Sequence, residues 1–215
     1  MANTYLHRTF TTPTNNKKWT YSLWVKKSAV TGNQAILSCG ADGNNRGTIY
    51  LADNGKLFYY ETTSGTDTTE IGTNRLFRDP NAWYHIVFRI DTTHGTEANR
   101  VRIYINGVQE TSFAVSNYPS LNATDYINSG IRHDISGRNH AGSSDLYFNG
   151  SMSHVHFLDG EDRDASYFGE TDSTTGQWKI KTSPTGINYG NNGFFILKDG
   201  NSLTDQSGKG NNFTL

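Results

Sequence analysis

The sequence is poor in features that cross-link or anchor a protein. It has one cysteine, Cys39, in 215 residues, which excludes a disulfide within the chain, so stability has to come from packing. No uninterrupted apolar run approaches the ~20 residues needed to span a bilayer. The first residues are polar and lack the apolar segment of a secretory signal. We therefore expect no membrane partner.

Charge of either sign is also scarce. Lys and Arg number 19 against 20 Asp and Glu, which gives a net charge of −1, and charged residues make up only 18% of the chain. The basic residues are scattered among acidic ones and form no stripe of the kind that follows a phosphate backbone. We therefore expect no nucleic-acid partner.

The abundant residues point to β-structure. Glycine occurs 22 times and aromatic residues make up 13% of the chain, whereas Met occurs twice. Thr, Tyr, Phe and Ile favour a pleated surface, and Gly and Asn favour tight turns. The length suits one large sandwich, and no linker or repeat divides it. We predict a single all-β domain over residues 1–215, built as an antiparallel two-sheet jelly-roll sandwich.

Period-two alternation marks the strands. Residues 19–27 alternate apolar and other side chains, which is typical of a half-buried strand. Asn54-Gly55 and Asn106-Gly107 lie between such segments, and Asn-Gly is a strong hairpin signal because both positions adopt positive φ. Further strands are predicted at 47–52, 56–61, 83–90, 100–105, 108–113, 151–158 and 193–198. In the strand 151–158, Ser153, Val155 and Phe157 are expected to share the inner face. The predicted core residues are Tyr21, Leu23, Val25, Tyr84, Ile86, Phe88, Ile90, Val101, Ile103, Val155 and Phe157.

One short helical turn is predicted at residues 165–168, with Asp162 or Asp164 as its cap and Gly169 at its end. Residues 161–164 are the densest acidic cluster. Because this cluster follows a glycine and contains Arg163, we interpret it as a solvated loop and helix cap.

Four segments, in this order, resemble strands of laminin-G-like domains. They are Thr20-Tyr21-Ser22-Leu23-Trp24-Val25-Lys26, Ala82-Trp83-Tyr84-His85-Ile86-Val87, Arg102-Ile103-Tyr104-Ile105-Asn106-Gly107 and Phe148-Asn149-Gly150-Ser151-Met152-Ser153-His154-Val155-His156-Phe157. The resemblance spans residues 19–158 and implies the concanavalin A-like jelly roll.

A second set of segments resembles, more specifically, laminin-G-like domains in tail-fibre and other virion proteins of marine bacteriophages. They lie at residues 79–85, 99–108, 157–160, 167–172, 175–178, 189–195 and 205–214. The last of them is similar to a segment that opens many laminin-G-like domains, which fits a jelly roll whose terminal strands lie side by side. It continues further in relatives, so this domain is also consistent with the N-terminal part of a longer chain.

This resemblance implies a virion structural protein, a tail or head fibre domain that acts as an adhesin in host attachment. It implies a location in the virion, a lectin-like carbohydrate-binding role and host-surface glycan as the ligand. The implied protein partners are other virion subunits, and we expect a homo-oligomer. Two alternatives stay open: a purely structural capsid-decoration or spacer module, and a polysaccharide-degrading enzyme.

We do not expect an enzyme. Glucanases of this fold carry a strand with a Glu-x-Asp-x-x-Glu-like pattern, which places the carboxylates of an acid/base pair on one face. The sequence contains no such strand and no nucleophile-elbow motif. We therefore predict no catalytic residues.

No metal site and no cofactor are predicted either. His154 and His156 have the spacing of two ligands on one strand face, but an outer polar face explains them better. Pentraxins and many laminin-G-like domains bind calcium through oxygen ligands. Here Arg138 and His140 stand where acidic ligands are expected, whereas Asp42-Gly43-Asn44-Asn45 keeps oxygen donors. This pattern leaves room for a single weakly held calcium ion and argues against a double site.

Two polar loops are the candidate ligand-binding elements. Sugar recognition on such a scaffold uses aromatic faces with Asn, Asp and Arg side chains, and loops on a rigid scaffold commonly carry recognition. Turn chemistry accounts for the same residues equally well. We expect a neutral glycan to bind at these loops and not on the sheet faces, while Trp178 and Tyr189 serve packing and His85 forms hydrogen bonds. The candidate ligand-binding residues are Asp42, Asn44, Asn45, Arg138, Asn139 and His140.

Overall fold

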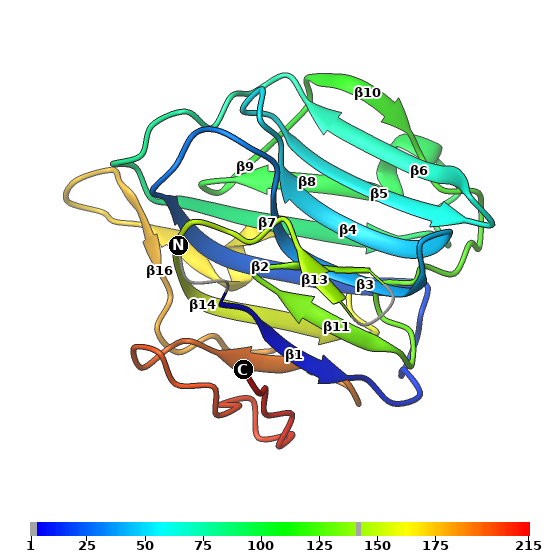
Figure 1. The fold of residues 1–215 in the computed structure, drawn as a ribbon. Coiled ribbons are helices and arrows are strands. Elements are labelled where there is room, and N and C mark those ends of the chain that lie inside the picture. Colours follow the sequence, from blue (N-terminus) through cyan, green and yellow to red (C-terminus); the bar gives the residue numbers. More distant parts are fainter. Residues whose placement is uncertain (1–3, 141–142) are drawn as a thin grey trace.

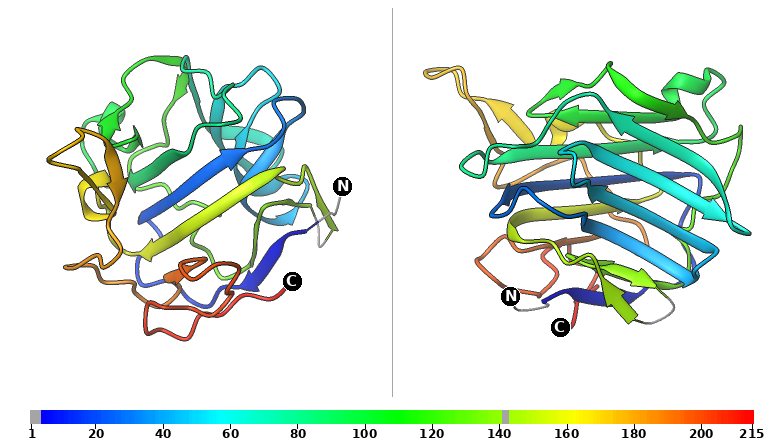
Figure 2. Two further views of the ribbon diagram at one scale, coloured as in Figure 1. Left: turned by 90° about the vertical axis from the view of Figure 1, so that its left-hand side faces the viewer. Right: turned by 45° about the horizontal axis from the view of Figure 1, so that its top comes forward.

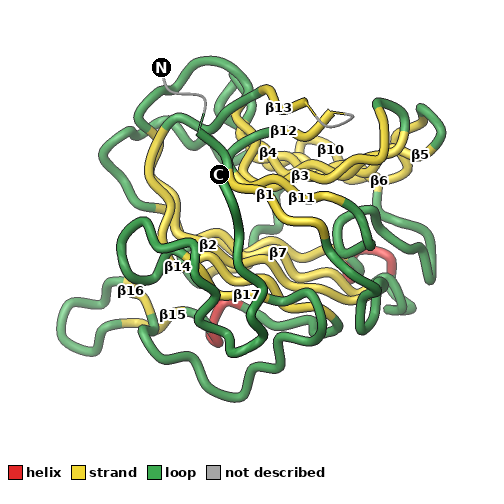
Figure 3. Tube along the Cα trace, turned by 60° about the horizontal axis from the view of Figure 1, so that its bottom comes forward, coloured by secondary structure: helices red, strands yellow, loops and turns green. Residues whose placement is uncertain are grey.

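Two antiparallel sheets lie face to face in the computed structural model, which describes residues 4–140 and 143–215. Figure 3 shows them as two separate layers, with loops joining them at both ends. The predicted all-β jelly-roll sandwich is confirmed.

The sheet that faces the viewer in Figure 1 has seven strands. In order across the sheet they are β1 (Leu6–Thr9), β11 (Arg132–Ile135), β3 (Gln34–Asp42), β4 (Asn45–Leu51), β5 (Leu57–Thr63), β6 (Thr66–Thr73) and β10 (Phe113–Asn117).

The second sheet has six strands and lies behind the first in Figure 1. In order they are β17 (Phe194–Ile196), β14 (Gly150–Asp159), β2 (Lys18–Lys27), β7 (Tyr84–Asp91), β8 (Val101–Ile105) and β9 (Val108–Gln109). Two small ladders pair β12 (Arg138–His140) with β13 (Ser143–Asp145), and β15 (Gly169–Thr171) with β16 (Trp178–Ile180).

Helix is limited to two 3-10 turns among the described residues, η1 (Glu97–Asn99) and η2 (Ala165–Tyr167). Asp164 caps η2 by accepting a hydrogen bond from the Ser166 backbone N–H, which settles the choice between the two predicted caps. Within the described part of the chain no helix has the length and apolar character to cross a membrane.

The core lies between the two sheets, and the predicted core side chains point into it; Tyr84, at the start of β7, is half-buried. Trp19 is fully buried and packs edge-on against Tyr59 and face-on against Phe157. Burying one such side chain contributes roughly 1.5–3 kcal/mol. Many of the aromatic side chains therefore pack between the two sheets.

Strand β14 departs from simple alternation. The backbone of His154 has φ of 49°, and the pairing with β2 shifts between Ser153 and His156. This β-bulge places Ser153 opposite Trp24, on the outer side, and turns Met152 toward the core. The expected inward orientation of Ser153 is wrong, because an inserted residue reverses the alternation on one side of a bulge.

The terminal segments lie side by side, as the closing motif suggests. Thr214 forms a bridge with His7 of β1, and Phe213 is buried in the core. Figure 2 shows the C-terminal end beside β1 in both views. The Asp205 carboxylate accepts hydrogen bonds from the backbone of Phe195, Ser207 and Asn211. The closing motif is thus a structural turn that fastens the chain end.

Candidate functional site

The outer face of the six-stranded sheet is closed. Ser22, His85 and His156 point away from the core, yet each is at most 1% exposed. The segment 161–189 covers them, and the left view of Figure 2 shows it, in yellow and orange, along this side of the molecule. The interpretation of residues 19–27 as a half-buried strand is wrong, because a later segment covers the face that alternation leaves outside.

Trp178 and Tyr189 fasten this covering segment. The Trp178 indole N–H donates to His85 Nδ1 at 2.9 Å, and the Tyr189 hydroxyl lies 2.9 Å from His156 Nδ1. The indole also lies against Gly107, where a Cβ would come within 2.6 Å of it. Trp178, Tyr189 and His85 therefore have the packing and hydrogen-bonding roles expected of them.

The outer face of the seven-stranded sheet carries an aromatic group. Tyr50 of β4 is paired with Phe58 of β5, and Tyr60 follows on the same face. The Tyr50 ring centroid lies 5.4 Å from that of Phe58 and 5.7 Å from that of Tyr60. All three residues are half-buried, so this group, which we call the aromatic platform, is partly open to solvent.

The platform is made possible by a glycine on the neighbouring strand. Gly72 of β6 pairs with Phe58, and a Cβ at this position would come within 2.4 Å of the phenyl ring. The ring therefore lies flat over the sheet. The platform was not predicted, although its signal is present in the sequence: Phe58 and Tyr60 alternate with the core residues Leu57 and Tyr59, so β5 is aromatic on both faces.

Two arginines border Tyr60. The Arg46 guanidinium lies 5.6 Å from the centre of the Tyr60 ring, a cation–π arrangement, and donates to the Gly43 carbonyl. Arg138 forms a two-pronged ion pair with Asp145 at 2.8 and 2.6 Å. Asp145 raises the pKa of Arg138, and a hydrogen bond with the Tyr60 hydroxyl adds to the shift. The two predicted loops therefore meet at one edge of the platform.

The first predicted loop is a tight turn between β3 and β4. Asp42 Oδ1 accepts from the Asn44 backbone N–H at 2.7 Å, and both Asp42 oxygens accept from the Asn45 amide. These bonds lower the pKa of Asp42. Asn45 Oδ1 accepts from Ser64 N–H and from the Tyr126 hydroxyl. Asp42 and Asn45 thus have turn roles, whereas the Asn44 side chain is exposed.

The second predicted loop is the β12–β13 hairpin, which crosses the outer side of β3. Asn139 is 1% exposed; its backbone N–H donates to Ser38 Oγ and its amide to the Gly40 carbonyl. The backbone of His140 belongs to β12, but its side chain lies outside the described residues. Asn139 therefore anchors the hairpin, and Arg138 is the member of this loop that reaches the platform.

Two polar atoms beside the platform have no hydrogen-bond partner in the described structure. They are Thr48 Oγ1, which lies opposite Tyr60 on the outer face, and Arg46 Nε. Buried polar atoms are nearly always paired. Both atoms are enclosed, so they are unsatisfied groups beside the platform and not part of the surface that a ligand would contact.

A family model with the description concanavalin A-like lectin/glucanases superfamily, from the laminin-G group, matches residues 2–166. The chain belongs to this superfamily. A comparison with curated proteins gave no match.

Solved structures support the superfamily fold at low sequence identity. The SAP-like heptameric pentraxin of Limulus polyphemus is 14% identical, with a TM-score of 0.56 over 93% of this chain and 91% of the pentraxin. The CBM40 of the Ruminococcus gnavus IT-sialidase is also 14% identical, with a TM-score of 0.52 over 77% and 96% of the two chains. The NanB sialidase of Streptococcus pneumoniae matches with a TM-score of 0.51 at 14% identity, over 74% of this chain but only 26% of the sialidase.

An acidic pair does exist in this superfamily member, but it lies inside the sandwich. Glu61 and Asp125 are 2% and 5% exposed. Glu61 accepts hydrogen bonds from the Tyr126 and Ile127 backbone N–H groups, and Asp125 accepts from the Trp19 indole. Burial raises the pKa of Glu61 and raises that of Asp125 to about 6. A polysaccharide cannot reach carboxyl groups between the sheets, so this pair does not supply glucanase chemistry.

Ser22 and His85 form a serine–histidine contact, with Ser22 Oγ 2.9 Å from His85 Nε2. Burial lowers the pKa of His85 to about 3, so the imidazole is neutral. Because its Nδ1 accepts the Trp178 N–H, its single proton lies on Nε2 and points at Ser22. The histidine thus has no lone pair directed at the serine and cannot act as its base.

Metal-ligating side chains do not gather among the described residues: no group of three or more His, Cys, Asp or Glu residues is arranged to hold an ion. His154 lies on the bulge and His156 beneath Tyr189, so the two do not share the regular strand face on which the metal alternative depended.

Proposed function

We propose that this chain is a glycan-binding module whose ligand lies across the aromatic platform, with Arg138 and Asn44 at its edge. This location on a sheet face departs from the expectation that the ligand binds at the loops alone. The observation that carries the proposal is a half-exposed group of three aromatic rings, bordered by two arginines, on the sheet face that the segment 161–189 does not cover. Rigid aromatic surfaces with a few polar groups around them suit sugar rings, which have apolar faces and polar edges.

The similar structures support a carbohydrate ligand as a class. The Ruminococcus gnavus CBM40 has been solved bound to α2,3-sialyllactose, and its TM-score against this chain is 0.52. At 14% identity this likeness concerns the fold. The choice of the platform as the binding surface comes from the contacts of this chain.

We place the module in a bacteriophage virion, as a tail or head fibre domain that binds host-surface glycan during attachment. The support is the order of the segments that resemble marine phage virion proteins, including residues 157–160, 189–195 and 205–214. In this setting its protein partners are other virion subunits, and it works as a homo-oligomer. A copy number equal to that of a capsid lattice would favour capsid decoration instead.

Removing one ring of the platform should abolish most of the binding. We expect Tyr60→Ala to raise the dissociation constant of a bound oligosaccharide about 10- to 100-fold, since truncating a tyrosine that anchors a binding surface costs about 2 kcal/mol or more. A glycan array followed by calorimetry with the best-bound oligosaccharide measures it. Tyr167→Ala, on the covered side of the molecule, is the matched control. Equal loss in both variants would mean that the platform is not the site.

The loop residues give a second, smaller expected effect. Arg138→Ala and Asn44→Ala should each weaken binding several-fold while lowering the free energy of unfolding by less than about 1 kcal/mol, because partly exposed ion pairs and surface side chains contribute little. Urea unfolding of the same samples separates binding from stability. Unchanged affinity in both variants would remove the loops from the site.

We also expect no hydrolytic activity. Glu61 and Asp125 are enclosed in the core, so neither carboxyl group can protonate a glycosidic oxygen. Incubation with a panel of algal and bacterial polysaccharides should release no reducing ends. Release that disappears on changing a single Asp or Glu would establish the enzyme alternative.

A further inference from the structure

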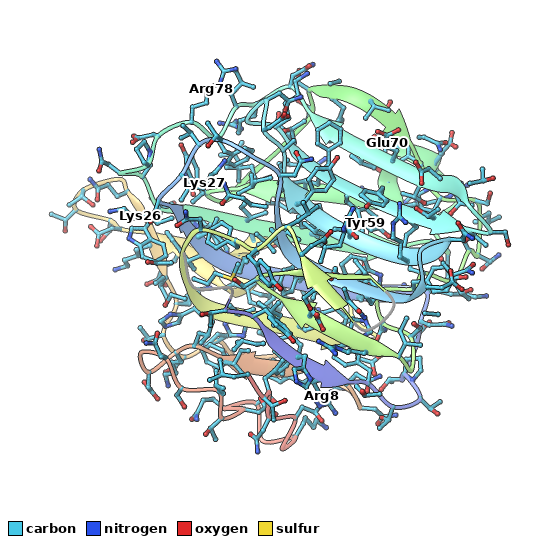
Figure 4. All side chains as sticks on the ribbon, in the orientation of Figure 1. Arg8, Lys26, Lys27, Tyr59, Glu70 and Arg78 are labelled. Carbon is cyan, nitrogen blue, oxygen red and sulfur yellow. The ribbon has the colours of Figure 1, made fainter. Side chains whose placement is uncertain are left out.

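The carboxylate of Glu70 lies on the same sheet face as the aromatic platform. Glu70 of β6 is paired directly with Tyr60 on one side and with Asn117 of β10 on the other. Directly opposed side chains in an antiparallel ladder lie about 5 Å apart, so the Glu70 carboxylate stands beside the Tyr60 ring. It is half-buried, and Figure 4 shows it on the strand β6.

Glu70 differs from the acidic residues around it in having no partner among the described residues. Asp145 is bound by Arg138, Asp42 accepts three hydrogen bonds within its own turn, and Asp67 accepts from the Thr62 hydroxyl. An ionised carboxylate is an acceptor only, with about four lone-pair directions. Glu70 therefore offers its full accepting capacity to whatever lies on the platform.

Two arginines border this face, and one of them, Arg138, has a carboxylate partner. Arg138 is neutralised by Asp145, and Arg46 is held over Tyr60 and donates to Gly43. The carboxylates around the platform, at Glu70, Asp145, Asp42 and Asp67, outnumber the guanidinium groups of Arg46 and Arg138, so the charge surrounding a ligand is negative. A carboxylated or sulfated sugar would meet repulsion here, whereas hydroxyl groups would find an acceptor.

We infer that Glu70 makes the platform selective for neutral, hydroxyl-rich sugars over acidic ones, by accepting hydrogen bonds from two hydroxyl groups of a sugar whose ring stacks on Tyr60. This inference rests on the proposed glycan-binding function. Its selectivity is opposite to that needed for a sialylated ligand, which carries a carboxylate. Glu70 is the specificity residue, and the aromatic rings supply the general affinity for sugar.

The test uses the full chain and a glycan array that presents neutral oligosaccharides beside their sialylated, uronic-acid and sulfated counterparts. We expect binding to the neutral members. Glu70→Gln should raise the dissociation constant of the best neutral oligosaccharide at least tenfold, because a hydrogen bond to a charged acceptor is about twice as strong as a neutral one. Glu70→Lys should shift binding toward the acidic counterparts. Glu170→Gln, on the covered side of the molecule, should bind like the wild type.

The outcomes separate the two proposals. Preference of the wild type for acidic glycans overturns the role of Glu70 and leaves the platform in place. The same holds if Tyr60→Ala loses binding while Glu70→Gln keeps it. Absence of binding to every glycan on the array overturns both. A loss of binding in Glu70→Gln together with a lower midpoint of thermal unfolding would mark a structural role for Glu70. Its side chain, which has no partner among the described residues, argues against such a role.

Discussion

Replacing Asp159 by asparagine should lower the free energy of unfolding by about 3 kcal/mol or more. Asp159 is 1% exposed at the end of β14. Its carboxylate accepts hydrogen bonds from the backbone N–H groups of Thr14, Asn15 and Asn192, and from the Asn128 amide. It therefore joins three segments that are distant in sequence.

The expected loss follows from the donors that surround the carboxylate. Asparagine keeps the shape but turns one oxygen into an NH₂ group, which would then face N–H donors. Each buried donor left without an acceptor costs about 1–3 kcal/mol. Urea unfolding of the variant measures the difference. Asp164→Asn is the matched control, because Asp164 caps η2 and asparagine caps a helix as well as aspartate does. A loss of stability in both variants, or in neither, would contradict this role of Asp159.

The hydrogen bonds of Asp159 show why local sequence patterns predicted the strands but not the contacts that hold distant segments together. Residues 157–160 and 189–195 looked like two separate pieces of one resemblance. In the structure Gly190 lies against the Asp159 carbonyl with no room for a Cβ, and Asn192 donates to the carboxylate. Alternation is a property of neighbouring residues, so it predicted β2, β5, β7 and β14. Contacts between segments that lie 33 or 145 residues apart leave no such periodic signal.

The candidate site was likewise predictable from the sequence only in part. Loop composition predicted ligand binding at the two segments that meet at the platform, and this stays a prediction; the structure shows that Arg138 is ion-paired and that Asn44 is exposed. The same composition gave no sign that Asn139 differs from the other loop residues. Its side chain is buried and its hydrogen bonds anchor the hairpin to the sheet. The composition also gave no weight to Tyr60, because an aromatic residue in a strand is ordinarily assigned to the core.

The second large effect concerns pH. We expect the free energy of unfolding to fall by at least about 1.4 kcal/mol per pH unit between about pH 5.5 and pH 4. The cause is a set of histidines that the fold keeps neutral. His85, His133 and His156 are at most 1% exposed. Burial lowers the pKa of His85 and His133 to about 3 and that of His156 well below its usual value.

Their hydrogen bonds add to this effect. The Asn128 backbone N–H donates to His133 Nε2, while His133 Nδ1 lies 2.9 Å from the Ile131 carbonyl. A second proton on His133 would therefore point at another donor, and the same holds for His85 beneath Trp178. In the unfolded chain these rings take up protons near pH 6.5. The stability they provide is thus complete above that pH and is lost as the pH falls toward their folded values.

The buried acids act in the opposite direction and decide the net slope. Asp125, with a pKa of about 6, and Glu61, whose pKa is raised by burial, bind protons in the folded state while the unfolded chain is still ionised. Their contribution therefore grows as the pH falls. They can bind at most two protons, against three at the histidines of the unfolded chain. At least one net proton favours unfolding, which corresponds to about 1.4 kcal/mol per pH unit.

A variant that lacks one of the buried acids measures how much that acid contributes to the pH dependence of stability. Asp125→Asn keeps an acceptor for the Trp19 indole but cannot bind a proton, so between pH 6 and pH 4 its stability should fall about 1 kcal/mol per pH unit more steeply than that of the wild type. Urea midpoints at pH 7, 6, 5 and 4 for both proteins measure the two slopes. A wild-type stability that stays level or rises on acidification would mean that the histidines do not remain neutral in the fold. Parallel slopes in the two proteins would mean that Asp125 is ionised throughout, in spite of its burial between the sheets.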